Sequence, residues 1–111
     1  METFDELLRA RRAAVLGALI DSADELAGIR AARGLENADD EHDPEGSTLW
    51  SDWSRITGMR ADAAAQLTAI DAALGRLESG DYGVCVVCGG GIPEARLRAR
   101  PEAATCVGCA G

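Results

Sequence analysis

The four cysteines of this chain form two pairs whose spacing is typical of a site for a tetrahedral metal ion. Cys85 and Cys88 are separated by two residues, seventeen residues follow, and Cys106 and Cys109 repeat the first spacing. Two thiolates separated by two residues can bind one side of a metal ion, and the second pair completes its tetrahedral coordination shell. We therefore expect one structural zinc ion (Zn2+) on all four cysteines. Such a site has no open position for a catalytic water, and with no nucleophile–base pair in the sequence we expect no enzymatic activity.

Other interpretations of the cysteines are weaker. A redox Cys-x-x-Cys pair normally stands alone at the start of a helix in a βαβ setting, which the sequence lacks. An iron–sulfur or single-iron site uses similar ligands and is compatible with the spacing. Disulfides are rare in the reducing cytoplasm. We place the protein there because the chain opens without a secretory signal and has no apolar run that would span a membrane.

The charge of the chain argues against direct binding to DNA. The 111 residues include 19 acidic and 11 basic side chains, for a net charge of −8. Proteins that bind nucleic acids need a basic surface to release counterions from the phosphates. We therefore expect a protein partner, with no sequence-specific DNA binding and no membrane contact.

Two long segments before the cysteines have the periodicity of helices. Over residues 3–33, Thr3 and Glu6 have the form of a capping box, and Gly34 is predicted to close the helix. The apolar series of this helix is heptad-like, at Leu8, Val15, Leu19, Ser22, Leu26 and Ile29. The second helix is predicted to end at Ser79-Gly80. Its series steps by four and three without a slip, through Leu49, Trp53, Ile56, Arg60, Ala63, Leu67, Ile70, Leu74 and Leu77.

Two helices of similar length with one apolar stripe each predict an antiparallel two-helix coiled-coil hairpin, rather than pairing with another chain. We expect a mainly α-helical monomer, with the hairpin in residues 1–79 and a small C-terminal four-cysteine zinc knuckle in residues 80–111. Arg60 is the only polar residue of the second series, and we expect its guanidinium to lie in solvent. In the knuckle, residues 92–97 are predicted to form a short helix with Pro93 at its first position.

The connection between the two helices, near residues 36–48, is strongly acidic. Six acidic residues fall between Glu36 and Glu45, with no Lys or Arg among them. One interpretation is that the cluster forms an acidic binding surface at the tip of a rigid helical hairpin. Such a surface would contact a cation or a basic surface of a partner. An equally good interpretation is structural. Asp43-Pro44 has the form of a helix start, and Asp, Gly and Pro are ordinary loop residues.

The residues around the cysteines resemble the zinc-finger signature of the DksA/TraR family. The resemblance rests on Asp81-Tyr82-Gly83-x-Cys85-x2-Cys88-Gly89-x2-Ile92-x3-Arg96-Leu97-x-Ala99-Arg100-Pro101-x4-Cys106-x2-Cys109. The predicted hairpin also fits the architecture of this family. The chain lacks the extra helices that flank the hairpin and the knuckle in longer members, so it resembles a short form.

The resemblance implies a transcription regulator that binds RNA polymerase through its secondary channel, with an acidic coiled-coil tip near the active centre. The family tip motif is Asp-x-x-Asp-x-Ala. In this chain Asp40 and Asp43 supply the two acids, and Glu45 stands in place of Ala. If the motif is aligned so that Asp39 is its first Asp, His42 falls at the position of the second Asp. The candidate partner-binding tip residues are therefore Asp39, Asp40, Asp43 and Glu45.

Two further expectations concern regulation and alternative functions. Some family members respond to the alarmone ppGpp through basic residues, one of them just after the last cysteine. Arg100 fits one such position, but Ala110 follows Cys109 and the chain has no Lys, so we do not predict ppGpp dependence. The alternatives are a zinc-stabilised coiled-coil adaptor for another protein, and a sensor in which thiol oxidation or zinc loss unfolds the knuckle.

Overall fold

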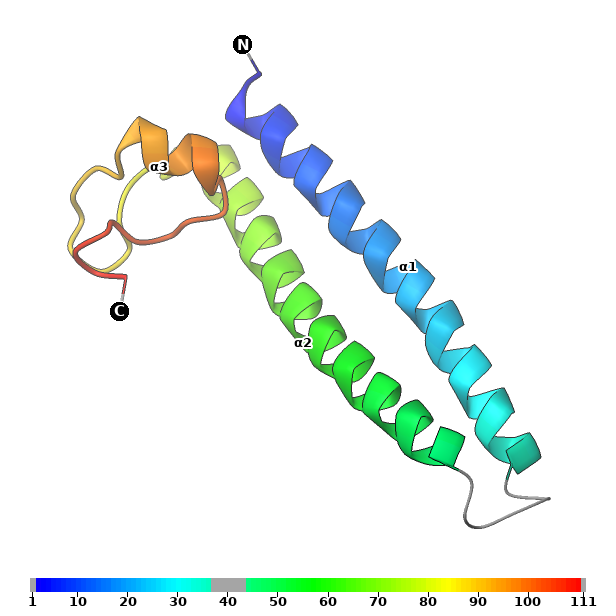
Figure 1. Ribbon diagram of the computed structural model, residues 1–111. Helices are drawn as coiled ribbons and strands as arrows, with labels where there is room; N and C mark the ends of the chain where they lie inside the picture. Colours follow the sequence, from blue (N-terminus) through cyan, green and yellow to red (C-terminus); the bar gives the residue numbers. More distant parts are fainter. Residues whose placement is uncertain (1, 37–43, 111) are drawn as a thin grey trace. The chain divides into compact units, whose positions relative to one another are not determined.

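A computed structural model of the protein describes residues 2–36 and 44–110, with side chains described outside residues 34–47 (Figure 1). Helix α1 spans Phe4–Glu36, α2 spans Pro44–Ser79 and α3 spans Glu94–Ala99. The described residues contain no β-strand, and one isolated antiparallel bridge joins Val84 and Gly91. The predicted fold class, a mainly helical chain with two long helices before a four-cysteine module, is confirmed. No helix in the described part of the chain has the length and apolar character needed to cross a membrane.

The chain divides into two compact units, each of which contains part of both long helices. The first unit consists of residues 1–15 and 65–111 and includes the cysteines. The second unit consists of residues 16–64. Within each unit, a stretch of α1 lies antiparallel beside a stretch of α2 (Figure 1). The division at residue 79 expected from the sequence stays a prediction.

The N-terminus of α1 is capped by Thr3. The backbone N–H of Glu6 donates to Thr3 Oγ1 over 3.1 Å, and the Thr3 hydroxyl donates to the Glu6 carboxylate over 3.1 Å. These bonds satisfy an amide that the first turn leaves free, as a capping residue does. The C-terminus differs from the prediction, because α1 continues through Gly34 to Glu36. A glycine inside a helix costs only about 1 kcal/mol relative to alanine, so it permits an end without requiring one.

Helix α2 starts at Pro44 and ends at Ser79, where the sequence predicts its end. Gly80 follows with φ of +84°, a left-handed conformation that glycine adopts without steric cost. The N–H of Asp81 donates to the carbonyl of Arg76 over 2.9 Å, and the N–H of Gly80 donates to the carbonyl of Leu77 over 3.4 Å. This pair of bonds is a Schellman motif, which ends the helix and turns the chain toward the cysteines.

The start of α3 is one residue later than predicted. Pro93 has φ of −56° but ψ of 139°, which is an extended conformation, so it precedes the helix instead of occupying its first position. Its carbonyl still accepts a hydrogen bond from the N–H of Leu97 over 3.1 Å. The ring of proline fixes φ alone, and the sequence therefore left ψ undetermined.

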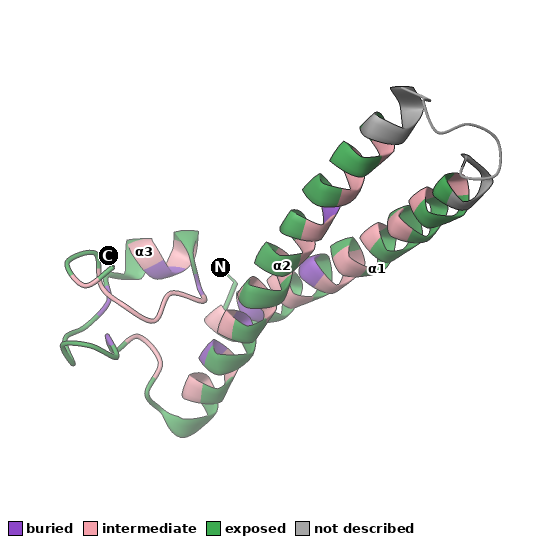
Figure 2. Cartoon of the chain, turned by 90° about the horizontal axis from the view of Figure 1, so that it is seen from below, coloured by how far each residue is buried: buried purple, intermediate pink, exposed green. Residues whose placement is uncertain are grey.

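The predicted apolar series are confirmed, because every position in both is buried or half-buried (Figure 2). In the unit of residues 1–15 and 65–111, the buried residues of α1 and α2 are Leu8, Val15, Ile70 and Ala73. Ala73 lies outside the predicted series. Near this core, Arg12 Nε lies 2.7 Å from an oxygen of Asp71 and links α1 to α2. Among the described side chains of residues 16–64, Ile56 is the buried apolar residue.

Arg60 differs from the prediction that its guanidinium lies in solvent. Its Nη1 donates to the carbonyl of Leu19 and to the hydroxyl of Ser22, both on α1. The polar positions of the two apolar series therefore meet across the helix pair. The reason is that Ser22 is short, which leaves room for the long arginine side chain and offers it an acceptor.

We expect the substitution Ile70→Ala to lower the free energy of unfolding by about 3 kcal/mol. Ile70 has 0% exposure, so the smaller side chain both loses buried area and leaves a cavity. Ile20→Ala is the matched control, because Ile20 is 64% exposed and its truncation should change stability by less than about 0.5 kcal/mol. Urea denaturation followed by circular dichroism measures both, and equal effects would show that Ile70 does not support the core.

Candidate metal centre

The first cysteine pair lies on a tight turn closed by glycine. The N–H of Cys85 donates to the carbonyl of Gly90 over 2.8 Å, and the N–H of Gly89 donates to the carbonyl of Cys85 over 2.9 Å. Gly89 has φ of +75°, which favours glycine. The chain then returns beside itself at the Val84–Gly91 bridge. The turn holds the side chains of Cys85 and Cys88 on the same side of the loop.

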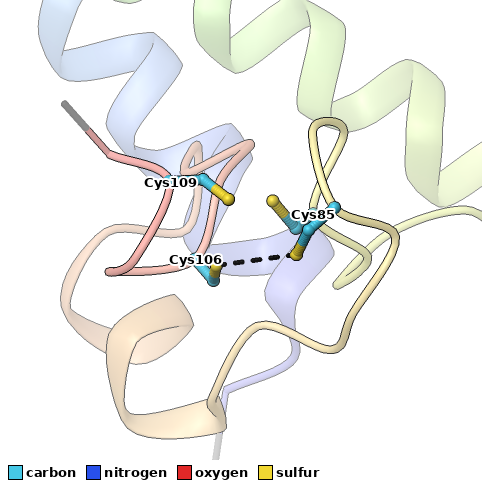
Figure 3. Close-up of side chains that lie close together, drawn as sticks. Cys85, Cys106 and Cys109 are labelled. Carbon is cyan, nitrogen blue, oxygen red and sulfur yellow. Dashed lines mark hydrogen bonds between the residues drawn. The ribbon is translucent and has the colours of Figure 1, made fainter.

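The second pair repeats this arrangement at the end of the chain. The N–H groups of Cys109 and Ala110 both donate to the carbonyl of Cys106, over 3.1 and 3.0 Å. The two turns are linked, because the N–H of Val86 donates to the carbonyl of Ala104 over 2.9 Å. Figure 3 shows the sulfur atoms of the two turns directed toward one another.

The sulfur positions fit a zinc ion. All four Sγ atoms lie within 4.8 Å of one another, and the Sγ atoms of Cys88 and Cys106 are 3.8 Å apart. A regular tetrahedron with Zn–S bonds of about 2.3 Å has sulfur–sulfur edges of about 3.8 Å. Four thiolates in a closed shell suit a structural zinc site and leave no position for a substrate.

The ionisation of the thiols also indicates a need for a cation. Backbone hydrogen bonds, first from Cys88 and then from Cys106 and Val87, lower the pKa of Cys85 to about 6. Side-chain hydrogen bonds with Cys106, Cys85 and Cys88 raise the pKa of Cys109 to about 12. When only the other cysteines surround each sulfur, the thiol of Cys85 therefore ionises easily, whereas the thiol of Cys109 resists ionisation. A divalent cation supplies the charge that lets all four thiolates coexist.

The core beneath the cysteines is small. Cys85 is 1% exposed, and with Ile92 and Leu97 it forms the buried cluster of the knuckle. Phe4 and Tyr82 pack against this cluster, as do Cys106 and Cys109. Three buried residues supply little hydrophobic stabilisation, so the metal has to provide much of the folding free energy.

The start of α1 contributes to this core, which the sequence analysis did not predict. The ring of Phe4 lies 5.2 Å from the ring of Tyr82, and the guanidinium of Arg98 lies 4.2 Å from the centre of the Phe4 ring. The Tyr82 hydroxyl donates to the carbonyl of Pro101 over 2.8 Å, and burial raises the pKa of Tyr82. Phe4 precedes the first apolar series, and its position in the sequence gives no sign of a partner near residue 82.

The arginines near the knuckle form specific structural contacts. Arg96 Nε donates to the carbonyl of Thr105 over 2.9 Å and so positions the residue before Cys106. Arg11 Nε lies 3.0 Å from Glu102 Oε2, an ion pair between α1 and the segment before the second cysteine pair. Arginines beside four thiolates can offset the negative charge of the site or simply form a solvated basic face. The structure gives Arg96 and Arg98 a third role as cross-links, while Arg100 is exposed.

The structure brings the four cysteines together and leaves the predicted tip undescribed. Asp39, Asp40 and Asp43 lie outside the described residues. Glu45 lies in the first turn of α2, and its side chain is outside the described part. The role of these four acidic residues therefore stays a prediction.

Comparisons with known proteins agree with this arrangement. Residues 80–111 match the family model for the prokaryotic dksA/traR C4-type zinc finger. The structure is similar to that of transcription factor DksA2 from Pseudomonas aeruginosa, with a TM-score of 0.77 and 25% sequence identity over 95% of this chain and 75% of that chain. A protein of Aquifex aeolicus described as uncharacterized is 50% identical over 46 residues, which are 41% of this chain and 32% of that protein. The match thus spans about a third of the Aquifex protein.

The fold and the site together define a helical protein with a C-terminal C4-type zinc finger. The zinc is structural, because the four cysteines supply a closed shell. The comparisons narrow this further: residues 80–111 match the dksA/traR C4-type zinc finger, and the fold of nearly the whole chain is similar to that of DksA2.

Proposed function

We propose that the protein is a non-enzymatic transcription regulator that binds RNA polymerase through the secondary channel of the polymerase. The observation that carries this proposal is the similarity to the transcription factor DksA2 over 95% of the chain. The similarity includes both long helices as well as the zinc finger, so it extends to the part of the molecule that would enter a channel.

The charge distribution supports a protein partner over DNA. The net charge is −8, and residues 36–45, from the last residue of α1 to the first turn of α2, hold six acidic residues and no Lys or Arg. An acidic segment is repelled by the phosphates of DNA and attracted to basic surfaces or bound cations. We assign the acidic tip to the neighbourhood of the polymerase active centre, with Asp40 and Asp43 as the acting residues.

The zinc finger has a structural role in this proposal. Its buried cluster packs against Phe4 and so holds the first turn of α1. The proposal also makes the protein a cytoplasmic monomer. Dependence on ppGpp is not part of the proposal, because Ala110 stands where responsive family members carry a basic residue and the chain has no Lys.

The direct test is the binding of the zinc-loaded protein to RNA polymerase core enzyme. We expect saturable binding that a known secondary-channel factor displaces competitively, because the two proteins would occupy the same channel. Fluorescence anisotropy of a labelled protein measures both effects. Absence of binding at micromolar concentrations, with helicity and zinc content confirmed, would overturn the proposal and favour an adaptor for another protein.

A further inference from the structure

Both tryptophans of the chain lie in the unit of residues 16–64, and each contacts an arginine of the other helix. The guanidinium carbon of Arg30 is 5.5 Å from the ring centre of Trp53, and that of Arg33 is 5.6 Å from the ring centre of Trp50. These distances are within the range of cation–π interactions. We call the four residues Arg30, Arg33, Trp50 and Trp53 the arginine–tryptophan patch.

The patch is open to solvent. Trp50 is 57% exposed, both arginines are exposed, and Trp53 is half-buried as a member of the predicted apolar series. An exposed cation–π pair contributes only about 0.5–1 kcal/mol, which does not offset the exposure of a large aromatic side chain to water. The folding of this unit therefore gives no sufficient reason for an exposed tryptophan at position 50.

The two arginines of the patch differ from most other arginines of the chain in their ion pairs with carboxylates. Five arginines form ion pairs with carboxylates: Arg9, Arg11, Arg12, Arg55 and Arg98. Among the side chains that the structure describes, Arg30 and Arg33 have no carboxylate within 4.0 Å, and their recorded partners are the tryptophan rings. No described carboxylate therefore neutralises their charge.

Acidic residues of the same unit lie on another side of the helix pair. Two cavities of 360 and 320 Å³ share Glu25, Arg55 and Ile56, and Asp21 and Asp52 also contribute to their walls. No residue of the patch lines either cavity. Arg30 follows Glu25 by five residues, which places it about 140° further around α1. The positive charge of the patch is thus separated from the acidic residues that line the two cavities, Asp21, Glu25 and Asp52.

We infer that the arginine–tryptophan patch is a docking surface for an acidic region of a partner protein. Tryptophan and arginine are the residues that most often dominate the binding energy of protein interfaces. A partner that covers Trp50 removes its apolar surface from water, and carboxylates of the partner pair with the guanidinium groups in a forked geometry. A protein partner fits better than a nucleic acid, since the chain has a net charge of −8 and the patch supplies only two cations. The partner is RNA polymerase, and this part of the inference rests on the proposed function.

The test compares substitutions in the patch with single substitutions of the same type on the cavity side. Trp50→Ala and the double variant Arg30→Glu/Arg33→Glu should each weaken binding to RNA polymerase core enzyme about thirtyfold. The controls are Met59→Ala, which truncates an apolar side chain that is 59% exposed, and Arg55→Glu. Both controls should bind within about threefold of the wild type. Circular dichroism and zinc content confirm that each variant is folded.

The outcomes separate this inference from the proposed function. If the wild type binds the polymerase and the patch variants bind equally well, the docking surface is overturned and the proposed function stands. If the wild type does not bind, the proposed function fails, and so does the partner assigned to the patch. A titration with the single-stranded oligonucleotide dT10 tests the nucleic-acid alternative through intrinsic tryptophan emission. Quenching at micromolar dT10 that Arg30→Glu/Arg33→Glu abolishes would overturn a protein partner.

Discussion

Replacement of Cys109 by serine is expected to abolish zinc binding and to unfold the knuckle. Structural zinc contributes an apparent binding free energy of about 10–16 kcal/mol, which is as large as the total stability of a typical domain. The buried cluster of Cys85, Ile92 and Leu97 is too small to replace it. Zinc content should fall from one ion per chain to none, as measured by atomic absorption.

The aromatic residues allow the two units to be followed separately in this variant. Tyr82 is the only tyrosine and packs against the knuckle core, whereas both tryptophans lie in residues 16–64. We expect the near-ultraviolet signal of Tyr82 to be lost while tryptophan emission stays close to that of the wild type. Val107→Ser is the control, because Val107 lies between two ligands and is 68% exposed. A Cys109→Ser protein that retains zinc and an ordered Tyr82 would refute the four-cysteine site.

Neutralising the acidic connection is expected to remove the effect on transcription while preserving the fold. The double variant Asp40→Asn/Asp43→Asn eliminates two of the six negative charges between residues 36 and 45. If these carboxylates act on a cation or a basic group near the polymerase active centre, the change should reduce the effect on open-complex lifetime at least tenfold, about 1.4 kcal/mol. The lifetime of competitor-resistant promoter complexes measures the effect.

The control for the acidic connection removes the same charge elsewhere. Asp24 and Asp62 are exposed residues of α1 and α2, so Asp24→Asn/Asp62→Asn matches the change in net charge. This control should regulate transcription as the wild type does, and both variants should bind the polymerase with similar affinity. Equal activity of the two variants would assign the acidic connection to a solvated loop.

The sequence predicted those features that depend on local patterns. The steps of four and three gave the buried face of α2, including Ile56 and Ile70, because side chains at these intervals share one side of a helix. The Schellman end at Gly80 was predictable for a similar reason, since a left-handed residue is required there and glycine adopts it freely. The cysteine spacing likewise predicted a cluster that the structure shows within 4.8 Å.

The features that the sequence did not reveal involve residues far apart in the chain. Arg60 was expected in solvent and instead bonds to Leu19 and Ser22, at separations of 41 and 38 residues. The contact of Arg11 with Glu102 spans 91 residues. Periodicity shows which face of a helix is apolar and contains no information on which polar side chain lies opposite another. The pairing of Arg33 with Trp50 escaped prediction for the same reason.

The packing of Phe4 against the knuckle has a consequence for engineering. Residues 80–111 are the segment that matches a family model, yet their buried cluster is covered in part by an aromatic ring from the other end of the chain. The recurring sequence module is therefore smaller than the unit that packs as a whole. A graft of residues 80–111 onto another scaffold would need a host aromatic residue over Tyr82, with a carbonyl for Arg98 to replace that of Glu2.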